Sequence, residues 1–284
     1  NDILEISVRD YLKLPPIVKN QLKGYKTGIN YPKQEIPLDP YVLGLWLGNG
    51  HSIETSITNF DSEIIQYLQL WCKEKGYEIN PRKNCDITYD IAGGFFNTLI
   101  DMNLLGNKHI PQKYLVNSRE IRLLVLAGLI DSAGYYQDNC YEIVQKKKEL
   151  SNDIVYLARS LGFAVTQTEV QKTCTNGTKE RVIEIYYKSS IYGEGLEEIP
   201  CLLKRKKANP RQQKGALVTE IKVESLGEGE YCGFEIDGNG RFLLGDFTVT
   251  HNTRISMDFL KFLLSIKELP PYVIYALPKE AVKS

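Results

Sequence analysis

Two short segments of the chain share one unusual pattern of apolar residues and glycines. Residues 42–50 read Val-Leu-Gly-Leu-Trp-Leu-Gly-Asn-Gly, and residues 126–134 read Leu-Ala-Gly-Leu-Ile-Asp-Ser-Ala-Gly. The third residue of each copy is a glycine, which lets another backbone approach closely. Gly134 ends the second copy, and a glycine in this place often adopts the left-handed conformation that ends a helix. The pattern therefore predicts two apolar helices, with room for another backbone to approach closely at Gly128.

The sequence after each copy is also repeated. In both repeats a short alternating run precedes a helix, which Asp61 is expected to cap in the first repeat and Ser151 in the second. The step from the first glycine of the copy to the glycine that ends this helix is 32 residues in the first repeat and 34 in the second. Two strand candidates come next each time, and Asn176-Gly177 predicts a hairpin turn in the second repeat. This near-equality indicates an internal duplication.

Composition places the chain among ordinary globular proteins with two domains. It has 284 residues, 43% of them hydrophobic, and a net charge of zero. No apolar run approaches the ~18 residues that a membrane span needs. The six cysteines lack C-x-x-C spacing, which favours reduced thiols in an intracellular protein of the cytoplasm or nucleus over a zinc site or a disulfide frame. Because the net charge is zero, DNA binding requires local clusters of positive charge.

The two segments resemble the paired signature helices of the LAGLIDADG homing endonucleases, in the two-copy form found inside inteins. The resemblance implies an α+β fold, with a duplicated αββαββα nuclease core and the C-terminal part of an all-β, Hint-type splicing domain. It implies double-stranded DNA as a partner, with a long asymmetric target site, and Mg²⁺ as the cofactor. The strands at 77–91 and 164–189 would enter major grooves, which admit two-stranded ribbons.

The resemblance also sets expected domain boundaries. We expect residues 1–40 to be the tail of the splicing domain and a linker, and residues 41–215 to be the endonuclease. Residues 216–252 would be the C-terminal splicing segment, and residues 253–284 would belong to the downstream host protein.

The metal positions of the family are altered in this sequence. Each family helix ends in an aspartate that holds the catalytic metal, and those positions here are Asn49 and Ala133. A carboxylate at a helix C-terminus faces the negative end of the helix dipole, which is unfavourable by ~0.3–1 kcal/mol, so two acids that meet there need a cation. Asn49 offers a neutral carbonyl and Ala133 offers no ligand. We therefore expect Mg²⁺-dependent hydrolysis of the phosphodiester to be disabled.

Basic residues supply further candidates for contact with DNA. Lys108, in Lys-His-Ile-Pro, resembles a lysine that assists cleavage in the fungal vacuolar-ATPase inteins, and Lys207 matches its second-repeat counterpart more loosely. Both could instead be surface lysines near phosphate. The stretch 204–214 is either a solvated linker or a phosphate-binding cluster. Its basic residues besides Lys207 are Lys204, Arg205, Lys206, Arg211 and Lys214.

Residues 249–253, Val-Thr-His-Asn-Thr, resemble the C-terminal splicing junction of inteins. In that chemistry the Asn252 side-chain amide attacks its own carbonyl, and His251 donates a proton to the departing amine. Thr253 is the hydroxyl nucleophile that accepts the upstream segment. Cys232 stands where the family has an assisting acid or cysteine, whereas Gly240 stands about where some relatives have a further histidine.

The start of an intein is missing from this sequence. Inteins begin with Cys, Ser or Thr and carry an early Thr-x-x-His block, but residue 1 is Asn and the three histidines lie at 51, 109 and 251. We therefore expect an N-terminal intein fragment as a partner. The residues after Thr253 resemble the helix and strand that come after the phosphate loop of P-loop NTPases, which suggests such a host. A split intein that acts only in trans-splicing, or a non-cleaving DNA-binding module, remains an alternative.

Overall fold

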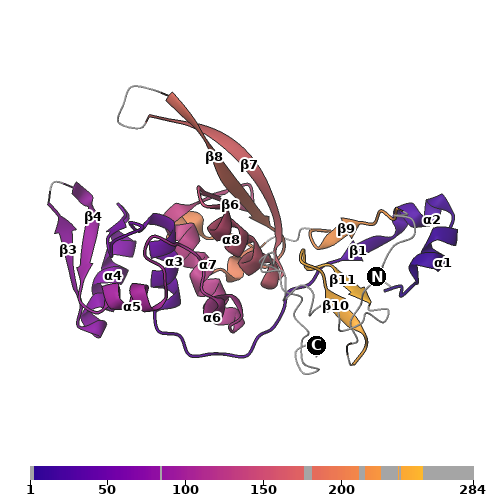
Figure 1. Ribbon diagram of the computed structural model, residues 1–284, viewed down its shortest axis with the longest axis horizontal. Coiled ribbons are helices and arrows are strands. Elements are labelled where there is room, and N and C mark those ends of the chain that lie inside the picture. The colour runs from indigo at the N-terminus through magenta and orange to yellow at the C-terminus, as the bar shows by residue number, and fades with distance from the viewer. Residues whose placement is uncertain are drawn as a thin grey trace, which may run out of the picture. The chain divides into compact units, whose positions relative to one another are not determined.

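The computed structural model describes residues 3–83, 85–175, 181–210, 215–224, 236 and 238–251. The chain divides into two compact units, one of residues 1–29 with 217–284 and one of residues 30–216 (Figure 1). Some of the predicted features fall outside the described residues: the Asn176-Gly177 turn, Arg211, Lys214, Cys232, Asn252, Thr253 and the rest of the 253–284 segment. In the part of the chain that is described, no helix is long and apolar enough to cross a membrane.

The first repeat of the larger unit combines three described helices with a small antiparallel sheet. Its elements are α3 (Pro40–Asn49), β2 (Ile57–Thr58), α4 (Ser62–Lys75), β3 (Glu78–Arg82), β4 (Cys85–Ala92) and α5 (Phe95–Asp101). The strand order is β2-β4-β3, and an isolated bridge joins Gly50 to Ile57 at the open edge. The alternating run between α3 and α4 forms a strand only at its end, in β2.

The second repeat has the same order of elements with longer strands. After the short α6 (Gln112–Leu115) come α7 (Arg119–Ala133), β5 (Gly134–Gln137), β6 (Cys140–Gln145), α8 (Lys148–Ser160), β7 (Ala164–Thr175), β8 (Arg181–Tyr192) and the 3-10 turns η1 (Leu196–Glu198) and η2 (Lys204–Lys206). The sheet order is β5-β6-β8-β7. In the first sheet, the bridge at Gly50 lies next to β2 as β5 lies next to β6 in the second sheet. The two sheets therefore have the same strand order. A mixed α and β fold built on a duplication is thus confirmed.

Helices α3 and α7 lie side by side in the centre of this unit (Figure 1). Both are buried on nearly all sides, with eight buried residues in α3 and ten in α7. Glycines allow the contact: a Cβ on Gly44 would lie 2.3 Å from the Val125 carbonyl oxygen, and one on Gly128 would lie 2.2 Å from the Tyr41 carbonyl oxygen. The close backbone approach predicted at Gly128 is therefore present.

Two local predictions were wrong at the level of single residues, whereas the predicted N-cap at Asp61 is right in position. Gly134 has φ −89°, which is extended rather than left-handed, and glycine is needed there because a Cβ would lie 2.7 Å from the Ile130 Cα. Asp61 stands at the N-cap of α4 but makes no side-chain cap hydrogen bond. Ser151 lies inside α8, where its hydroxyl contacts that of Ser189 at 3.2 Å.

The smaller unit contains two short antiparallel pairs. Its helices are α1 (Val8–Lys13) and α2 (Pro16–Gln21), and Ser7 caps α1. Strand β1 (Lys23–Tyr25) pairs with β9 (Val218–Glu220), and β10 (Arg241–Leu243) pairs with β11 (Val249–His251). Residues from both ends of the described chain thus form one unit, as the Lys26–Asp246 ion pair of 2.9 Å also indicates.

Candidate active centre

The C-terminal ends of α3 and α7 meet at the centre of the larger unit. The Asn49 side-chain amide donates a hydrogen bond of 2.8 Å to the Ser132 carbonyl. A Cβ on Gly48 would lie 3.2 Å from the Ala133 Cβ. Glycine at 48 therefore lets the last turns of the two helices touch, which brings both candidate metal positions into one place.

The residues at these helix ends do not fit a magnesium ion. The Asn49 side-chain amide donates its hydrogen bond to the Ser132 carbonyl of α7, and the Ala133 side chain has no atom that could bind a metal. Mg²⁺ is usually held by one or two carboxylates, which neither position provides. Within the described residues, no three His, Cys, Asp or Glu side chains are grouped so that they could hold a metal ion. We therefore assign no catalytic step to a metal at this centre.

Asp131 is the nearest acid in the α7 sequence, and it points away from the helix ends. Its Oδ2 accepts hydrogen bonds from the Tyr41 hydroxyl at 2.8 Å and from the Leu202 backbone N–H at 2.6 Å. Burial raises the pKa of the Asp131 carboxyl, although these donors and the Lys206 charge act against the shift. The side chain thus ties α3, α7 and the segment before η2 together, and it does not replace the missing aspartates.

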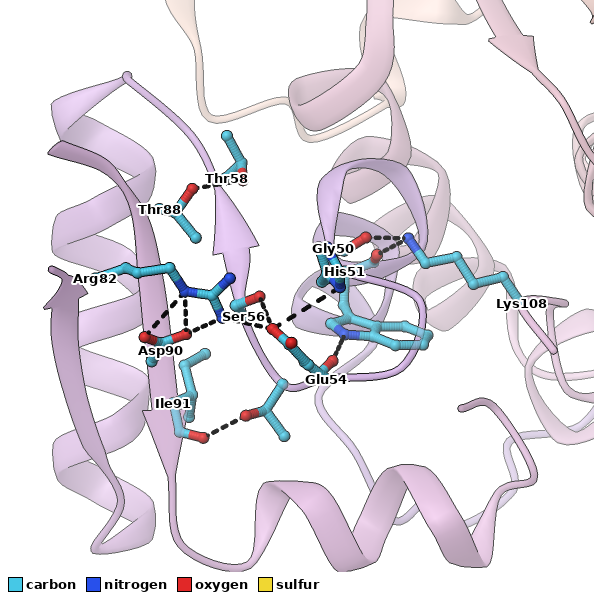
Figure 2. Close-up of polar contacts among 12 residues, drawn as sticks. Gly50, His51, Glu54, Ser56, Thr58, Arg82, Thr88, Asp90, Ile91 and Lys108 are labelled. Atoms are coloured by element: carbon cyan, nitrogen blue, oxygen red, sulfur yellow. Dashed lines mark hydrogen bonds and ion pairs between the residues drawn. The ribbon is translucent and has the colours of Figure 1, made fainter. Parts of the chain in front are cut away.

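Lys108 holds the C-terminal end of α3. Its ammonium donates hydrogen bonds to the carbonyls of Trp46 at 2.7 Å, Leu47 at 3.1 Å and Gly50 at 2.6 Å (Figure 2). The last carbonyls of a helix lack partners inside the helix, so this lysine satisfies them and opposes the negative end of the dipole. Burial lowers the pKa of Lys108 to about 7.

Lys206 does the same for α7. Its ammonium donates to the carbonyls of Ile130 and Asp131, both at 2.8 Å. Burial lowers the pKa of Lys206, with the Asp131 charge opposing the shift. The structural counterpart of Lys108 is therefore Lys206, whereas the sequence suggested Lys207. The contact of Lys206 with DNA stays a prediction; in the structure the residue is 9% exposed and its ammonium is occupied by the two carbonyls.

The other described members of the basic cluster lie at the surface. Lys204, Arg205 and Lys207 are exposed. The Arg205 guanidinium forms two hydrogen bonds with the Asp61 carboxylate, at 2.6 and 2.8 Å, and this pair joins η2 of the second repeat to the start of α4 in the first. Lys204 and Lys207 thus remain candidates for phosphate contact, while Arg205 also links the repeats.

A polar network that sequence reasoning missed fixes the loop after α3. The Arg82 guanidinium on β3 bonds both the Asp90 carboxylate, with Nε at 3.0 Å from Oδ1, and the Glu54 carboxylate (Figure 2). The Trp46 indole donates to the Glu54 carbonyl at 3.0 Å, and the His51 Nδ1 lies 3.8 Å from the Glu54 Oε2. The β3–β4 hairpin is therefore connected through Glu54 to the end of α3. Nothing in the spacing of these residues along the sequence signalled this contact.

Residues 109–208 match the family model described as homing endonuclease. This stretch is a homing endonuclease domain. It contains the whole second repeat with α7 and Lys206, and α3 of the first repeat packs directly against it.

Relatives of the chain include curated proteins and solved structures. The chain is 26% identical over 254 residues to the replicative DNA helicase DnaB of Mycobacterium intracellulare, covering 88% of this chain and 41% of that protein. It is 24% identical over 262 residues to the homothallic switching endonuclease of Saccharomyces cerevisiae, covering 72% of this chain and 42% of that protein. The chain thus spans less than half the length of these relatives. The structure of I-DmoI in complex with DNA and Mn matches with a TM-score of 0.36 and 16% identity, covering 54% of this chain and 88% of that chain. A TM-score this low supports no inference about function.

The candidate splicing residue that is described lies outside the homing endonuclease domain. His251 ends β11 and pairs in register with Arg241 on β10. The Glu5 Oε1 lies 2.9 Å from the Arg241 Nε and 4.0 Å from the His251 Nε2. Gly240 faces the same ring, since a Cβ there would lie 2.9 Å from the imidazole. Asn252, Thr253 and Cys232 lie outside the described residues, so their roles remain predictions.

Proposed function

We propose that the chain carries intein splicing residues together with a homing endonuclease domain that binds a long asymmetric double-stranded DNA site without cutting it. The observation that carries this proposal is the pair of neutral helix ends. The signature helices are fully packed, yet Asn49 bonds to Ser132 and Ala133 has no ligand atom. The two aspartates of the family are replaced, whereas the pair of helices that would carry them is present.

The residues around the centre favour DNA phosphate. Lys108 and Lys206 cover the carbonyls at the two helix ends, which on their own would repel an anion. Exposed Lys204 and Lys207 add charge beside the second end. Contacts with phosphate add affinity that does not depend on the base sequence. The two-stranded ribbons of each sheet can enter major grooves and contact base edges. These side chains orient the duplex, and no bond is broken because no group here activates water.

The smaller unit carries the second part of the proposal, which is splicing at Asn252–Thr253. The Asn252 amide nitrogen attacks its own backbone carbonyl, the bond to Thr253 breaks, and His251 donates the proton that the leaving amine needs. Thr253 then belongs to the spliced product, and Cys232 assists. This reaction requires the N-terminal intein fragment as a partner. The similarity to a protein named as a replicative DNA helicase supports a host enzyme of that kind, and the P-loop NTPase suggestion agrees with it.

A mixing experiment tests the splicing half. Intact-mass spectrometry of the chain with its matching N-terminal fragment should detect release of residues 253–284 joined to the segment that precedes that fragment. Asn252→Ala should block the release and His251→Ala should slow it. Release that continues in the Asn252→Ala variant would mean ordinary proteolysis.

A gel-shift experiment tests the DNA half. Duplexes that the chain selects from a random library should bind with an affinity that falls steeply with salt. If the chain were a split intein acting only in trans-splicing, it would select no sequence.

A further inference from the structure

Strands β10 and β11 place Arg241 and His251 next to each other in the smaller unit. The two strands run side by side (Figure 1), and Arg241 of β10 pairs in register with His251 of β11. Residues directly opposite each other in an antiparallel pair have Cβ atoms ~4.5–5.5 Å apart, so their side chains share one face and interact. His251 is the described member of the candidate splicing junction. A group that lies on this face is therefore close to its imidazole.

A carboxylate from the N-terminal segment lies against both side chains. The Glu5 Oε1 accepts a hydrogen bond of 2.9 Å from the Arg241 Nε, and the same oxygen lies 4.0 Å from the His251 Nε2. The Arg241 hydrogen bond is the main cause that holds the pKa of the Glu5 carboxyl below its usual range, and the His251 charge adds to it. Glu5 is therefore ionised at neutral pH, and one of its oxygens lies between a guanidinium and an imidazole.

The start of α1 fixes the place of Glu5. The Ser7 side chain caps this helix by accepting a hydrogen bond of 3.1 Å from the Asp10 backbone N–H. On the same helix, Tyr11 is buried, and its hydroxyl donates a hydrogen bond of 3.5 Å to the Ile221 carbonyl, just after β9. Glu5 lies two residues before the cap, so the docked helix brings its carboxylate to the β10–β11 pair.

Gly240 leaves room for the imidazole in this position. A Cβ at residue 240 would lie 2.9 Å from both the Cε1 and the Nε2 of the His251 ring, which is too close for any side chain to stand there without moving the ring. This is also about the position where some inteins have a further histidine. The glycine thus lets the His251 ring lie where Glu5 reaches its Nε2, and a carboxylate is present where that second histidine is not.

The contact contributes little to folding. The Glu5 side chain is 54% exposed and the His251 side chain is 52% exposed. Ion pairs between exposed groups add little to stability, because solvent screens the charges and ordering the side chains costs entropy. Stability therefore does not account for this arrangement, whereas the orientation of a ring that must donate a proton does.

We propose that Glu5 is a positioning residue for His251 in the splicing reaction, and that Arg241 holds the Glu5 carboxylate in place. A carboxylate next to one ring nitrogen sets the direction in which an imidazole points and which nitrogen carries the hydrogen. The 4.0 Å separation is longer than a hydrogen bond, and such contacts often tighten when a site is assembled with its partner. This inference rests on the proposed splicing and adds the residue that orients the proton donor.

The orientation matters at one step of the reaction. The Asn252 side-chain nitrogen forms a bond to its own backbone carbonyl carbon, and the attacking amide loses a proton to water. The bond from that carbon to the Thr253 nitrogen breaks, and this nitrogen takes up the proton that His251 donates. A ring turned away from the departing nitrogen cannot make this transfer, so loss of the Glu5 carboxylate should slow the step.

Imidazole NMR of the chain alone tests the contact without a splicing partner. The chain has three histidines, and the signals that disappear in His251→Ala are those of His251. In Glu5→Gln the ring signals of His251 should move, while those of His51 and His109 stay in place. Glu220→Gln is the matched control, because Glu220 forms an exposed ion pair with a lysine of β1 in the same unit, and it should move none of the three. Unmoved His251 signals in Glu5→Gln would overturn the inference.

The rate of release in the mixing experiment tests whether the contact acts in the reaction. Glu5→Gln should slow the release of residues 253–284 about fivefold, which is the size of effect that an exposed ion pair can supply. Glu5→Asp keeps the charge and should retain more of the rate. In the His251→Ala background, Glu5→Gln should cause no further slowing, because the carboxylate acts only through the ring. Association of the two chains, measured by gel filtration, should be equal in all variants.

The outcomes separate this inference from the proposed splicing. If the parent chain releases the segment and Glu5→Gln releases it at the same rate, the inference fails and the proposed splicing stands. Slowing that adds to that of His251→Ala would also overturn the inference, since Glu5 would then act on the fold or on association. If the parent chain releases nothing with its matching fragment, the proposed splicing fails and this inference fails with it.

Discussion

Asn49, the last residue of α3, donates a hydrogen bond of 2.8 Å from its side-chain amide to the carbonyl of Ser132 in α7. An ionised aspartate at position 49 has no donor and would set its charge against that carbonyl. The asparagine therefore joins the two helix ends directly, where the family's acids would need a cation between them.

Restoring both acids should reverse this relationship. In the Asn49→Asp, Ala133→Asp variant we expect a loss of about 1–3 kcal/mol in the free energy of unfolding, because a hydrogen bond is lost and two carboxylates approach each other. Mg²⁺ should raise the melting temperature of this variant and leave that of the parent chain unchanged. Thermal denaturation with and without Mg²⁺ measures both effects. An equal response of the two proteins would mean that positions 49 and 133 do not form a metal site.

The glycine contact between α3 and α7 should be intolerant of a single methyl group. Gly44→Ala places its Cβ 2.3 Å from the Val125 carbonyl oxygen, so the helices must separate. We expect a loss of about 3 kcal/mol in stability, by analogy with overpacked cores. Gly76→Ala is the control: its φ is +69°, but a Cβ there meets nothing within 4 Å. It should cost about 1 kcal/mol through backbone strain. Equal losses in urea denaturation would argue against the close packing.

The packing of α3 against α7 could be predicted from the sequence, whereas several contacts around it could not. The periodic apolar residues and paired glycines predicted two apolar helices and the duplication, since those features depend on local pattern, and the family resemblance implied the mixed α and β fold. The sequence could not distinguish Lys206 from Lys207, because both are lysines in the same basic stretch. Which of the two side chains faces α7 depends on the conformation of the 3-10 turn η2. The Arg82–Glu54 and Arg205–Asp61 contacts join residues far apart in sequence, and no spacing rule connects such partners.

Lys108 should make stability depend on pH. Its pKa is lowered by burial to about 7, whereas in the unfolded chain it is near 10.5. Between these values the unfolded state binds more protons than the folded state, so this group's contribution makes the fold more stable as the pH rises from about 7 to about 10. Lys108→Met should flatten that slope and lower stability at neutral pH by removing a hydrogen-bond donor from three carbonyls. Melting temperatures of both proteins across this pH range give the comparison, and an unchanged slope would count against the buried ammonium.

The exposed lysines of the basic cluster should contribute affinity without specificity. Lys204→Ala with Lys207→Ala should weaken binding nearly uniformly across DNA sequences and reduce the salt slope by about 2. Lys206→Ala is a contrasting variant, because it uncovers the α7 carbonyls and should lower thermal stability. Binding titrations at several salt concentrations distinguish the two. A loss confined to one base position would mean that Lys204 or Lys207 reads sequence.

The most direct test compares cleavage of the selected duplexes by the parent chain and by the Asn49→Asp, Ala133→Asp variant in Mg²⁺. If the fold is an intact homing endonuclease whose chemistry was lost only at these helix ends, the parent binds without cutting. The variant then nicks or cuts the same duplexes near their centre. Magnesium-dependent cutting by the parent, or a folded and DNA-binding variant that never cuts, would contradict it.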